Sequence, residues 1–475
     1  MKKKNYLMLL CMLSIFLLSG CKGSTKDVTT EQTTEATTEV ATETTTEATT
    51  EATTEEATTE LDPANLEAGV MDEMIQNALD HMSLEEKIGQ MFIANIELLD
   101  PAEPKSYDYQ KITKRMKETL KNYPVGGVIF FSRNIKTPKQ TKTFIKRLQK
   151  VSKYPLFISV DEEGGEVARI ANNPKMNTTK FPSMAEIGAT EDEEKAFEVG
   201  DTIGKEIHAL GFNLDFAPVA DLETNPDNPE IGDRAFSSDP ELAGKMVAQV
   251  VKGLQGQNVS ATLKHFPGHG SATEDTHKGY ADITQSIKRL RKVEFVPFQA
   301  GIEAGVDLIM VSHLAVTSVT DSKTPASMSP LIINEILRNE LGYQNIVITD
   351  ALNMKAITDY YTPGKAAVTA VEAGADILLM PENLEDAFDA IYQAILDGDL
   401  DEKRIDESVT RILKTKIKRG VISLEDPLLQ PVEESEEATT EVEMTTEEKV
   451  DQKTKKQETK KEKKTTEEEN TTKES

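Results

Sequence analysis

The sequence predicts an α/β fold built on a parallel sheet, and three observations support this prediction. First, apolar runs alternate with longer segments of helical periodicity between residues 61 and 431. Second, these runs are continuously apolar, as in strands that helices cover on both faces. Third, polar residues directly follow one apolar run after another. Eight such units in roughly 370 residues fit a (β/α)8 barrel of the TIM type, with an open doubly wound sheet as the alternative.

The predicted elements follow one another in regular order. Strands are predicted at 91–96, 125–131, 156–160, 212–217, 261–263, 308–311, 346–348 and 377–380. Helices are predicted at 83–91, 137–154, 191–210, 240–256, 287–304, 329–341, 364–373 and 384–396. Ser83 and Glu86 have the spacing of a capping box, which supports the start of the first of these helices. In a barrel the carboxyl ends of all strands meet at one rim, so the polar residues after them would surround one pocket.

Both ends of the chain differ in composition from the middle. Residues 1–20 combine a basic start with a short apolar run, which predicts a secretory signal. The ending Leu-Ser-Gly-Cys resembles the bacterial lipobox, which implies that Cys21 carries a lipid and holds the protein at the extracytoplasmic face of the cell membrane. Residues 21–60 are rich in Thr and Glu, and residues 432–475 are rich in charge. We expect a disordered linker and a disordered tail there.

Composition also narrows the class of partner. The chain has 82 acidic and 54 basic residues, a formal net charge of −28, which argues against a nucleic-acid partner. Its glycine pairs lie outside any Gly-x-Gly-x-x-Gly context, so we predict no nucleotide or other cofactor. We expect the protein to be a monomer.

The segment 264–277 is dense in titratable groups. It holds three of the six histidines together with one Lys, one Asp and one Glu. Its Pro and Gly residues disfavour a helix, so we expect a loop at a strand end, which is a favourable place for catalysis. Asp275 and His277 are two residues apart, and an extended loop would point both side chains the same way. The carboxylate would then orient the imidazole and raise its pKa.

Other candidate residues follow predicted strands. Asp161 follows one strand, with Arg169 further along the same segment, and Arg234 comes after a polar loop. Asp350 ends another strand, where a carboxylate is either a helix cap or a group exposed to a ligand. His313 also follows a strand, and we interpret it as mainly structural. Each residue alone could be an ordinary surface ion or cap, but their shared position after strands predicts a common pocket.

Several motifs, taken in order, resemble glycoside hydrolase family 3. They are Asp161-Glu162-Glu163-Gly164-Gly165, Ile231-Gly232-Asp233-Arg234, Lys264-His265-Phe266-Pro267-Gly268-His269-Gly270, Asp275-Thr276-His277 and Thr349-Asp350. The resemblance spans about residues 66–422 and is closest to the β-N-acetylhexosaminidase branch that acts on peptidoglycan fragments. One departure is Glu166, where the family pattern leads us to expect Arg.

The resemblance implies a retaining double displacement that releases terminal β-linked N-acetylglucosamine. Asp350 would be the nucleophile that forms a glycosyl-enzyme, and His277, oriented by Asp275, would be the acid/base. The positions that would hold the sugar are Asp161, Arg169, Arg234, Lys264 and His265. Other family members place a carboxylate acid/base on a second domain, and the segment after residue 429 is too short and too polar to form one. We therefore expect a single catalytic domain at 61–431.

Other functions remain open at this stage. A metal hydrolase would use the three histidines of segment 264–277, although Pro and Gly disfavour the helix on which zinc-binding histidines share a face. A sugar-binding protein displayed on the cell surface would use the same barrel without catalysis. Within the family, β-glucosidase or β-xylosidase specificity is an alternative, as is phosphate in place of water as the acceptor. We favour the hydrolase without a metal.

Overall fold

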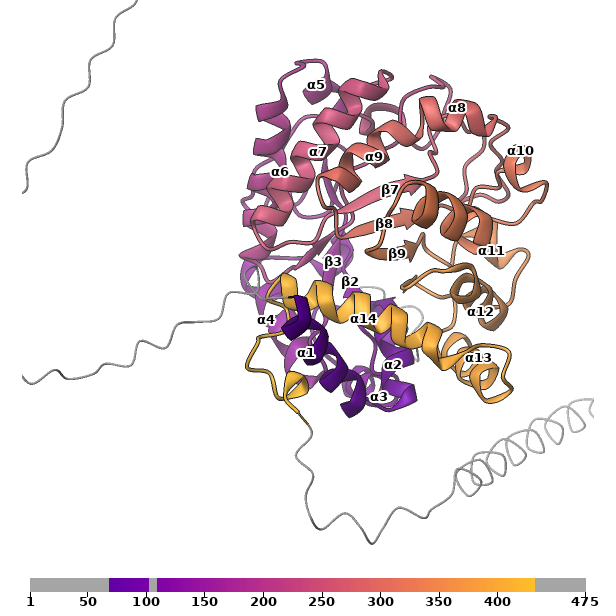
Figure 1. The fold of residues 1–475 in the computed structure, drawn as a ribbon. Helices are drawn as coiled ribbons and strands as arrows, with labels where there is room; N and C mark the ends of the chain where they lie inside the picture. Colours follow the sequence, from indigo (N-terminus) through magenta and orange to yellow (C-terminus); the bar gives the residue numbers. More distant parts are fainter. Residues whose placement is uncertain (1–67, 102–108, 432–475) are drawn as a thin grey trace, which may run out of the picture. The chain divides into compact units, whose positions relative to one another are not determined.

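Eight parallel strands form the centre of the fold, with helices around them (Figure 1). The structure is a computed structural model that describes residues 68–101 and 109–431. The strands are β1 (Phe92–Asn95), β2 (Gly127–Ile129), β3 (Phe157–Val160), β6 (Leu214–Asp215), β7 (Thr262–Phe266), β8 (Leu308–Val311), β9 (Ile346–Thr349) and β10 (Leu378–Leu379). All eight predicted strands are present. The predictions for residues 1–20, 21–60 and 432–475, including Cys21, lie outside the described residues.

The strands pair in two parallel sheets. One sheet has the order β10-β1-β2-β3-β6 and the other has the order β7-β8-β9. Three isolated parallel bridges lie between the sheets, and they join Leu214 to Ser260, Val219 to Lys264 and Ile348 to Ile377. The architecture is a TIM-barrel-like α/β fold, in which each strand is followed by at least one helix.

The strands are apolar because they are buried on both faces. Every residue of β1, β3, β8 and β9 is buried. Gly127 lets β2 lie close to its neighbour, since a Cβ there would come within 2.8 Å of the Cβ of Phe157. After β2, the ring of Phe130 lies edge-on to Phe144 at 5.4 Å and to Phe212 at 5.5 Å. Strands and surrounding helices therefore share one hydrophobic core.

The predicted helices are present, with two differences. The matching helices are α2 (Leu84–Gln90), α4 (Pro138–Val151), α6 (Glu193–His208), α7 (Pro240–Gly256), α12 (Pro363–Ala373) and α13 (Leu384–Leu396). Ser83 caps α2, and Glu86 completes the predicted capping box. The single helix predicted at 287–304 is wrong, because Val293 leaves helical geometry and separates α8 (Ile287–Lys292) from α9 (Phe295–Glu303). The segment predicted at 329–341 is the π-helix η6 (Leu331–Glu340).

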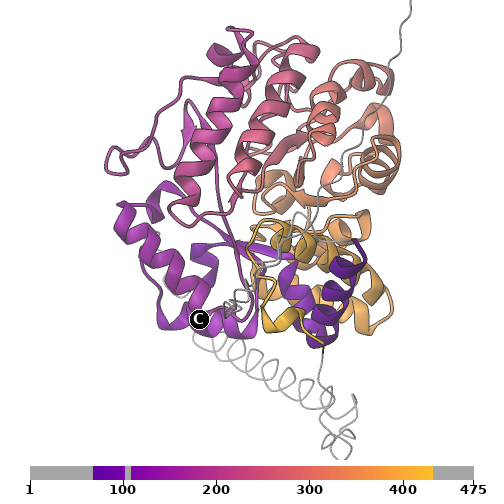
Figure 2. The same ribbon diagram turned by 60° about the vertical axis from the view of Figure 1, so that its left-hand side comes forward.

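Three longer helices, α1 (Ala68–His81), α3 (Lys114–Asn122) and α14 (Glu402–Lys418), were not predicted, and neither were the short helices α5 (Met184–Gly188), α10 (Thr317–Thr320) and α11 (Lys355–Thr358). α14 covers amino ends of the strands, and α1 packs beside it (Figures 1 and 2). The Nζ of Lys416 donates to the Gln90 side chain before β1 at 2.8 Å and to the Pro155 carbonyl before β3 at 2.7 Å. Arg419 follows α14 and donates to Asp307 before β8 at 3.0 Å. Because α14 covers amino ends of the strands, the carboxyl ends of the strands form the face that is available for a site.

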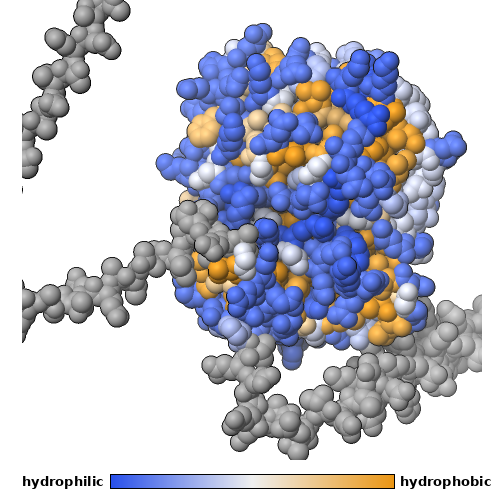
Figure 3. Space-filling model, in the orientation of Figure 1, coloured by the Kyte–Doolittle hydropathy of each residue, from blue (hydrophilic) through white to orange (hydrophobic). Residues whose placement is uncertain are grey.

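The outer surface mixes polar and apolar side chains (Figure 3). Within residues 68–101 and 109–431, the large apolar side chains that are exposed are Val70, Phe197, Leu331, Tyr360 and Leu396, which belong to five different segments. Single apolar side chains of this kind are ordinary on protein surfaces. None of the described helices is long and apolar enough to cross a membrane.

Candidate active site

A cavity of about 310 Å³ opens at the carboxyl ends of the strands. Seven of the residues predicted for catalysis or sugar binding line it: Asp161, Arg169, Arg234, Lys264, His265, His277 and Asp350. The remaining one, Asp275, contacts His277. These residues are far apart in the sequence, and the fold brings them together because the strand ends converge.

The segment after β3 forms a small hairpin that separates two neighbouring carboxylates. Its strands are β4 (Glu162–Gly164) and β5 (Val167–Ala168), which pair antiparallel. The carboxylate of Glu162 accepts the N–H groups of Ile170 at 2.7 Å and Ala171 at 2.8 Å, and burial raises its pKa to about 7. Glu163 lines the cavity instead, because successive side chains of a strand point to opposite sides.

Glu163 joins the two most buried cations of the cavity. Its carboxylate accepts two hydrogen bonds from Arg234, each 2.8 Å long, and lies 2.6 Å from the Nζ of Lys264. Burial opposes ionisation of Glu163, but Arg234 and Lys264 outweigh it and hold the pKa well below its usual value. Burial likewise lowers the pKa of Lys264, whereas Asp161 and Glu163 raise it overall. Lys264 therefore stays charged although it is buried.

Asp161 and Arg169 extend this group of charged side chains and are both partly exposed. Oδ1 of Asp161 accepts a hydrogen bond from the Nζ of Lys264 at 3.0 Å, and Oδ2 lies 3.8 Å from Arg169. The side chains of Asp161 and Arg169 are 16% and 32% exposed. An acceptor held rigidly by Lys264 and a donor beside it suit the hydroxyl groups of a polar ligand.

His265 lies at the end of β7, which extends three residues beyond the predicted strand because Lys264, His265 and Phe266 belong to it. The buried Asp221 accepts from its Nδ1 at 2.7 Å, and the same carboxylate accepts the backbone N–H groups of His265 at 3.0 Å and His269 at 2.5 Å. Since Nδ1 is engaged, Nε2 is the ring atom that His265 can present to the cavity.

Asp350 follows β9 and is held by its own backbone. Its Oδ1 accepts the N–H of Ala351 at 2.7 Å. Burial raises its pKa, but the nearby His313 and His265 outweigh this effect and lower the pKa overall. His313 is buried between Ser327, which contacts its Nδ1 at 2.8 Å, and the carbonyl of Ala351, which accepts from Nε2 at 3.0 Å. His313 thus supports the backbone that follows Asp350.

His277 lies on a tight turn, so the extended loop predicted for it is wrong. Oδ1 of Asp275 accepts the backbone N–H of His277 at 2.9 Å, as in an Asx turn. The predicted side-chain contact exists nevertheless, with 3.2 Å between Nδ1 of His277 and Oδ1 of Asp275. A second carboxylate, Glu230, binds the same Nδ1 more closely. This hydrogen bond is opposed in part by burial, and it raises the pKa of His277 to about 9.

Glu163, Glu230 and His269 line the cavity but were not predicted as site residues. Glu230 lies 2.6 Å from Nε2 of the buried His269, so one carboxylate joins a buried imidazole to the exposed His277. The available signal was the position of Glu230, four residues before Arg234 in a polar loop. Sequence spacing did not indicate the direction of its side chain.

One group of side chains here has the spacing of a cation site. Glu230, Asp275 and His277 each place a possible ligand atom within 4.8 Å of the other two. The hydrogen bonds that already join these groups account for the spacing, and a metal ion would have to displace the proton on Nδ1 of His277. We assign no metal to the group.

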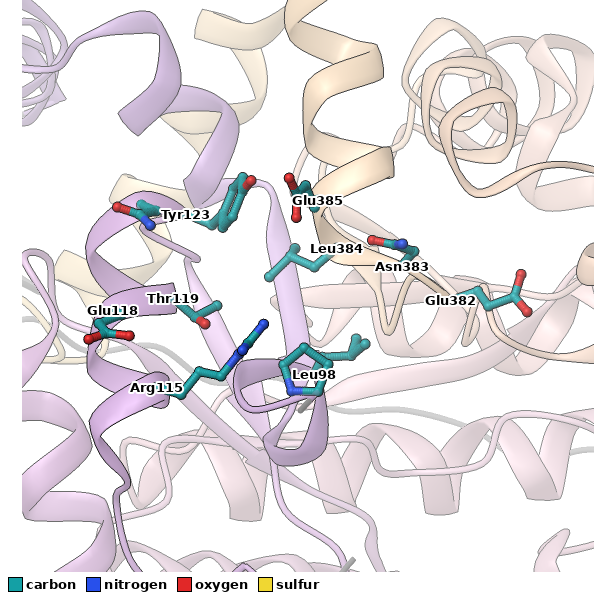
Figure 4. Close-up of a pocket in the computed structure, with 11 residues that line it drawn as sticks. Leu98, Arg115, Glu118, Thr119, Tyr123, Glu382, Asn383, Leu384 and Glu385 are labelled. Atoms are coloured by element: carbon teal, nitrogen blue, oxygen red, sulfur yellow. The ribbon is translucent and has the colours of Figure 1, made fainter. Parts of the chain in front are cut away.

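A larger hollow, of about 510 Å³, lies between α3 and the amino end of α13 (Figure 4). Figure 4 shows Tyr123 close to Glu385, and burial together with Glu385 raises the pKa of this tyrosine. None of the predicted site residues lines this hollow. Volume alone therefore does not identify the site.

A strand-end carboxylate and a charged imidazole facing one polar cavity provide the two groups that an enzyme of the glycoside hydrolase class needs, a carboxylate and a proton donor at the scissile bond. A family model described as the glycosyl hydrolase family 3 N terminal domain matches residues 83–415. The chain belongs to glycoside hydrolase family 3.

Known relatives agree with this assignment. Beta-hexosaminidase A of Pseudoalteromonas piscicida is 34% identical over 339 residues, which cover 65% of this chain and 56% of that protein. Beta-hexosaminidase of Stenotrophomonas maltophilia strain K279a is 32% identical over 329 residues, which cover 64% of this chain and 96% of that protein. The chain thus spans little more than half of the first relative and nearly all of the second.

Solved structures show the same relationship. A glycoside hydrolase family 3 beta-N-acetylglucosaminidase from Paenibacillus sp. str. FPU-7 has a TM-score of 0.67 and 38% identity, over 72% of this chain and 63% of that chain. Beta-glucoside phosphorylase BglX has a TM-score of 0.66 and 28% identity, over 76% of this chain and 63% of that chain.

Proposed function

We propose that the protein is a retaining exo-β-N-acetylglucosaminidase that removes terminal β-linked N-acetylglucosamine from peptidoglycan fragments. The observation that carries this proposal is that Asp350 and His277 line one cavity together with a set of buried, charged hydrogen-bonding groups. The names of the hexosaminidase relatives and of the Paenibacillus structure support the substrate class.

In the first step Asp350 attacks the anomeric carbon and forms a glycosyl-aspartate, while His277 gives a proton to the leaving oxygen. The lowered pKa of Asp350 keeps the nucleophile ionised, and the raised pKa of His277 keeps the donor protonated at neutral pH. In the second step water attacks the anomeric carbon, the neutral imidazole takes the proton of that water, and the bond between the sugar and Asp350 breaks to release the sugar and the free carboxylate.

Five residues hold the sugar in this proposal. Asp161 offers carboxylate oxygen as an acceptor, and Lys264, Arg169 and Arg234 are donors, with Glu163 keeping two of these cations in place. His265 contributes Nε2, because Asp221 occupies its other ring nitrogen. Rigid donors and acceptors of this kind discriminate between sugars, since an unmatched buried polar group is costly.

The test is to compare three para-nitrophenyl glycosides, the β-N-acetylglucosaminide, the β-glucoside and the β-xyloside, with wild type and His277→Ala. A strong preference for the N-acetyl sugar supports the specificity. A loss in the variant supports the role of His277 as the base for water, because nitrophenolate leaves with little help from an acid. Preference for the glucoside or xyloside would leave the family assignment intact and refute the substrate class. Absence of turnover on all three would point to a sugar-binding protein.

A second candidate is transfer to phosphate instead of water. Lys264, Arg169 and the charged His277 make the cavity cationic in places, and an imidazole repels phosphate less than a carboxylate does. The likeness to a beta-glucoside phosphorylase also supports this candidate. Adding inorganic phosphate and looking for a sugar 1-phosphate among the products separates the two reactions.

Two structural details belong to the same proposal. We infer that the two sheets form one closed (β/α)8 barrel. The parallel bridge between Leu214 of β6 and Ser260, just before β7, supports this inference, as does the bridge between Ile348 of β9 and Ile377, just before β10. We also propose that the protein is a monomer anchored by a lipid on Cys21, with residues 21–60 as a tether. The lipobox resemblance supports the anchor.

A further inference from the structure

Glu230 gathers three side chains of the segment that carries His277. It lies between β6 and α7, and its carboxylate is 9% exposed. One oxygen is 2.6 Å from Nε2 of His269 and accepts from the hydroxyl of Thr276 at 3.3 Å, and the other binds Nδ1 of His277. A single carboxylate therefore ties one loop of the cavity to the next.

The position of Glu230 is itself fixed from both sides. Its backbone N–H donates to Oδ1 of Asn228 at 2.9 Å, and its carbonyl accepts from Arg234 at 2.8 Å. The amide nitrogen of Asn228 in turn donates to the carbonyls of His269 at 2.9 Å and Ala272 at 3.0 Å. Since both loops are bound at the backbone, the carboxylate can hold an imidazole in one place.

Asp275 is arranged for a different task. Its Oδ1 accepts the backbone N–H of His277 at 2.9 Å, which closes the turn, and its Oδ2 pairs with Lys278 at 2.9 Å. The side chain of His277 is 69% exposed, so packing does not hold the ring. Its orientation must come from hydrogen bonds, and the closer of the two to Nδ1 comes from Glu230.

We propose that Glu230 is the positioning residue of the acid/base: it holds Nδ1–H of His277 so that Nε2 carries the proton that is transferred. This inference rests on the proposed function. The Nε2–H bond breaks as the proton moves to the glycosidic oxygen, the C1–O electron pair stays on that oxygen, and Asp350 bonds to C1. Water later returns a proton to Nε2, and Nδ1–H remains donated to Glu230 throughout.

The charged surroundings of His277 agree with this role. Glu230 acts from the loop after β6, Asp275 from its own turn and Asp350 from the end of β9, and all three raise the pKa of the imidazole. His313, which follows β8, is buried close to Asp350, and burial lowers its own pKa. Glu230 contributes most, because it forms the closest hydrogen bond.

The experiment compares Glu230→Gln with Asp275→Asn in the full chain. The matched control is Asp227→Asn, an exposed carboxylate of the same loop. Two substrates separate the roles: para-nitrophenyl β-N-acetylglucosaminide, whose leaving group needs little acid help, and N,N′-diacetylchitobiose, whose leaving group needs a proton. EDTA in every assay keeps adventitious cations away from the side chains of Glu230, Asp275 and His277, which have the spacing of a cation site.

We expect Glu230→Gln to lose about 10-fold or more in kcat/KM on chitobiose and much less on the nitrophenyl substrate, since positioned acid catalysis contributes roughly 100-fold or more. We also expect the alkaline limb of its pH profile to move down by more than one pH unit. Equal losses on both substrates with an unchanged pH profile would indicate a merely structural role and overturn the proposal. If Glu230→Gln does not fold, Glu230→Asp serves as the second variant. Because this variant keeps a carboxylate, we expect the alkaline limb of its pH profile to stay close to that of wild type even where its activity falls.

The proposed function fails in a different way from this inference. If His277→Ala is as active as wild type on chitobiose, His277 is not the proton donor, whatever Glu230 does. If His277→Ala is inactive on chitobiose while Glu230→Gln matches Asp227→Asn, only the positioning role of Glu230 is refuted.

Discussion

At the scale of residues, the cavity depends on how buried charges are balanced. Lys264 is almost fully buried, and it keeps its charge because Asp161 and Glu163 both lie within 3.0 Å. Glu163 also accepts two hydrogen bonds from Arg234. Removing one carboxylate would leave two cations competing for Asp161, which is the group expected to meet the sugar.

Glu163→Gln should therefore destabilise the protein and weaken substrate binding together. Breaking a buried ion pair from one side costs about 3 kcal/mol. We expect a loss of that order in the free energy of urea unfolding and a clear rise in KM. Glu166→Gln, an exposed residue of the same hairpin, is the control. A variant with unchanged stability and unchanged KM would show that Glu163 does not organise the cations.

The pKa directions at the site predict the pH profile of the wild type. A raised pKa keeps His277 protonated, and so able to donate, up to about pH 9. A lowered pKa keeps Asp350 ionised at pH values below the ordinary pKa of an Asp carboxyl. We expect kcat/KM on chitobiose to be flat across neutral pH, to fall above about pH 9 and to fall again only in strong acid. An alkaline limb near pH 6.5, the usual value for His, would contradict the contact with Glu230.

At the scale of elements, the strands were predicted from the sequence and several helices were missed. Continuous apolar runs identify strands because both faces are buried, as in Leu308–Val311. α14 was missed although its sequence carries the helical signal, since Ile405, Val409, Ile412 and Ile417 recur at helical spacing and form its buried face. The site residues on strand ends were found, whereas Glu230 was not, since its role depends on how one loop lies against another.

α14 provides a prediction of its own through Lys416. This lysine is fully buried with only neutral acceptors, and burial lowers its pKa to about 7. The unfolded chain therefore binds more protons than the folded chain between about pH 7 and pH 10, and this group makes stability rise with pH there.

Replacing Lys416 by Met should remove that rise. We expect the difference in unfolding free energy between Lys416→Met and wild type to change by up to about 1.4 kcal/mol per pH unit across this interval, in favour of wild type at the alkaline end. Urea unfolding at several pH values measures it, and other titrating groups cancel in the difference. A difference independent of pH would mean that Lys416 is not held in a desolvated position.

At the scale of the whole molecule, the catalytic residues and the proposed anchor occupy separate parts of the sequence. Every predicted catalytic and sugar-binding residue lies between positions 161 and 350, whereas the proposed lipid acceptor is Cys21. Loss of the lipid should therefore change where the enzyme is and leave its chemistry unchanged.

Cys21→Ala tests this separation. Acyl chains attach a protein to a bilayer by burying their methylene groups in it, so loss of the residue that carries them should remove this attachment. We expect the variant to move from the membrane fraction to the medium while kcat/KM on the nitrophenyl substrate stays within about twofold, because the described site lies far along the chain from the change. If the Cys21→Ala variant stays at the membrane to the same extent as the wild type, the proposed lipid on Cys21 is refuted. Release with a large loss of activity would instead show that the ends of the chain contribute to the site.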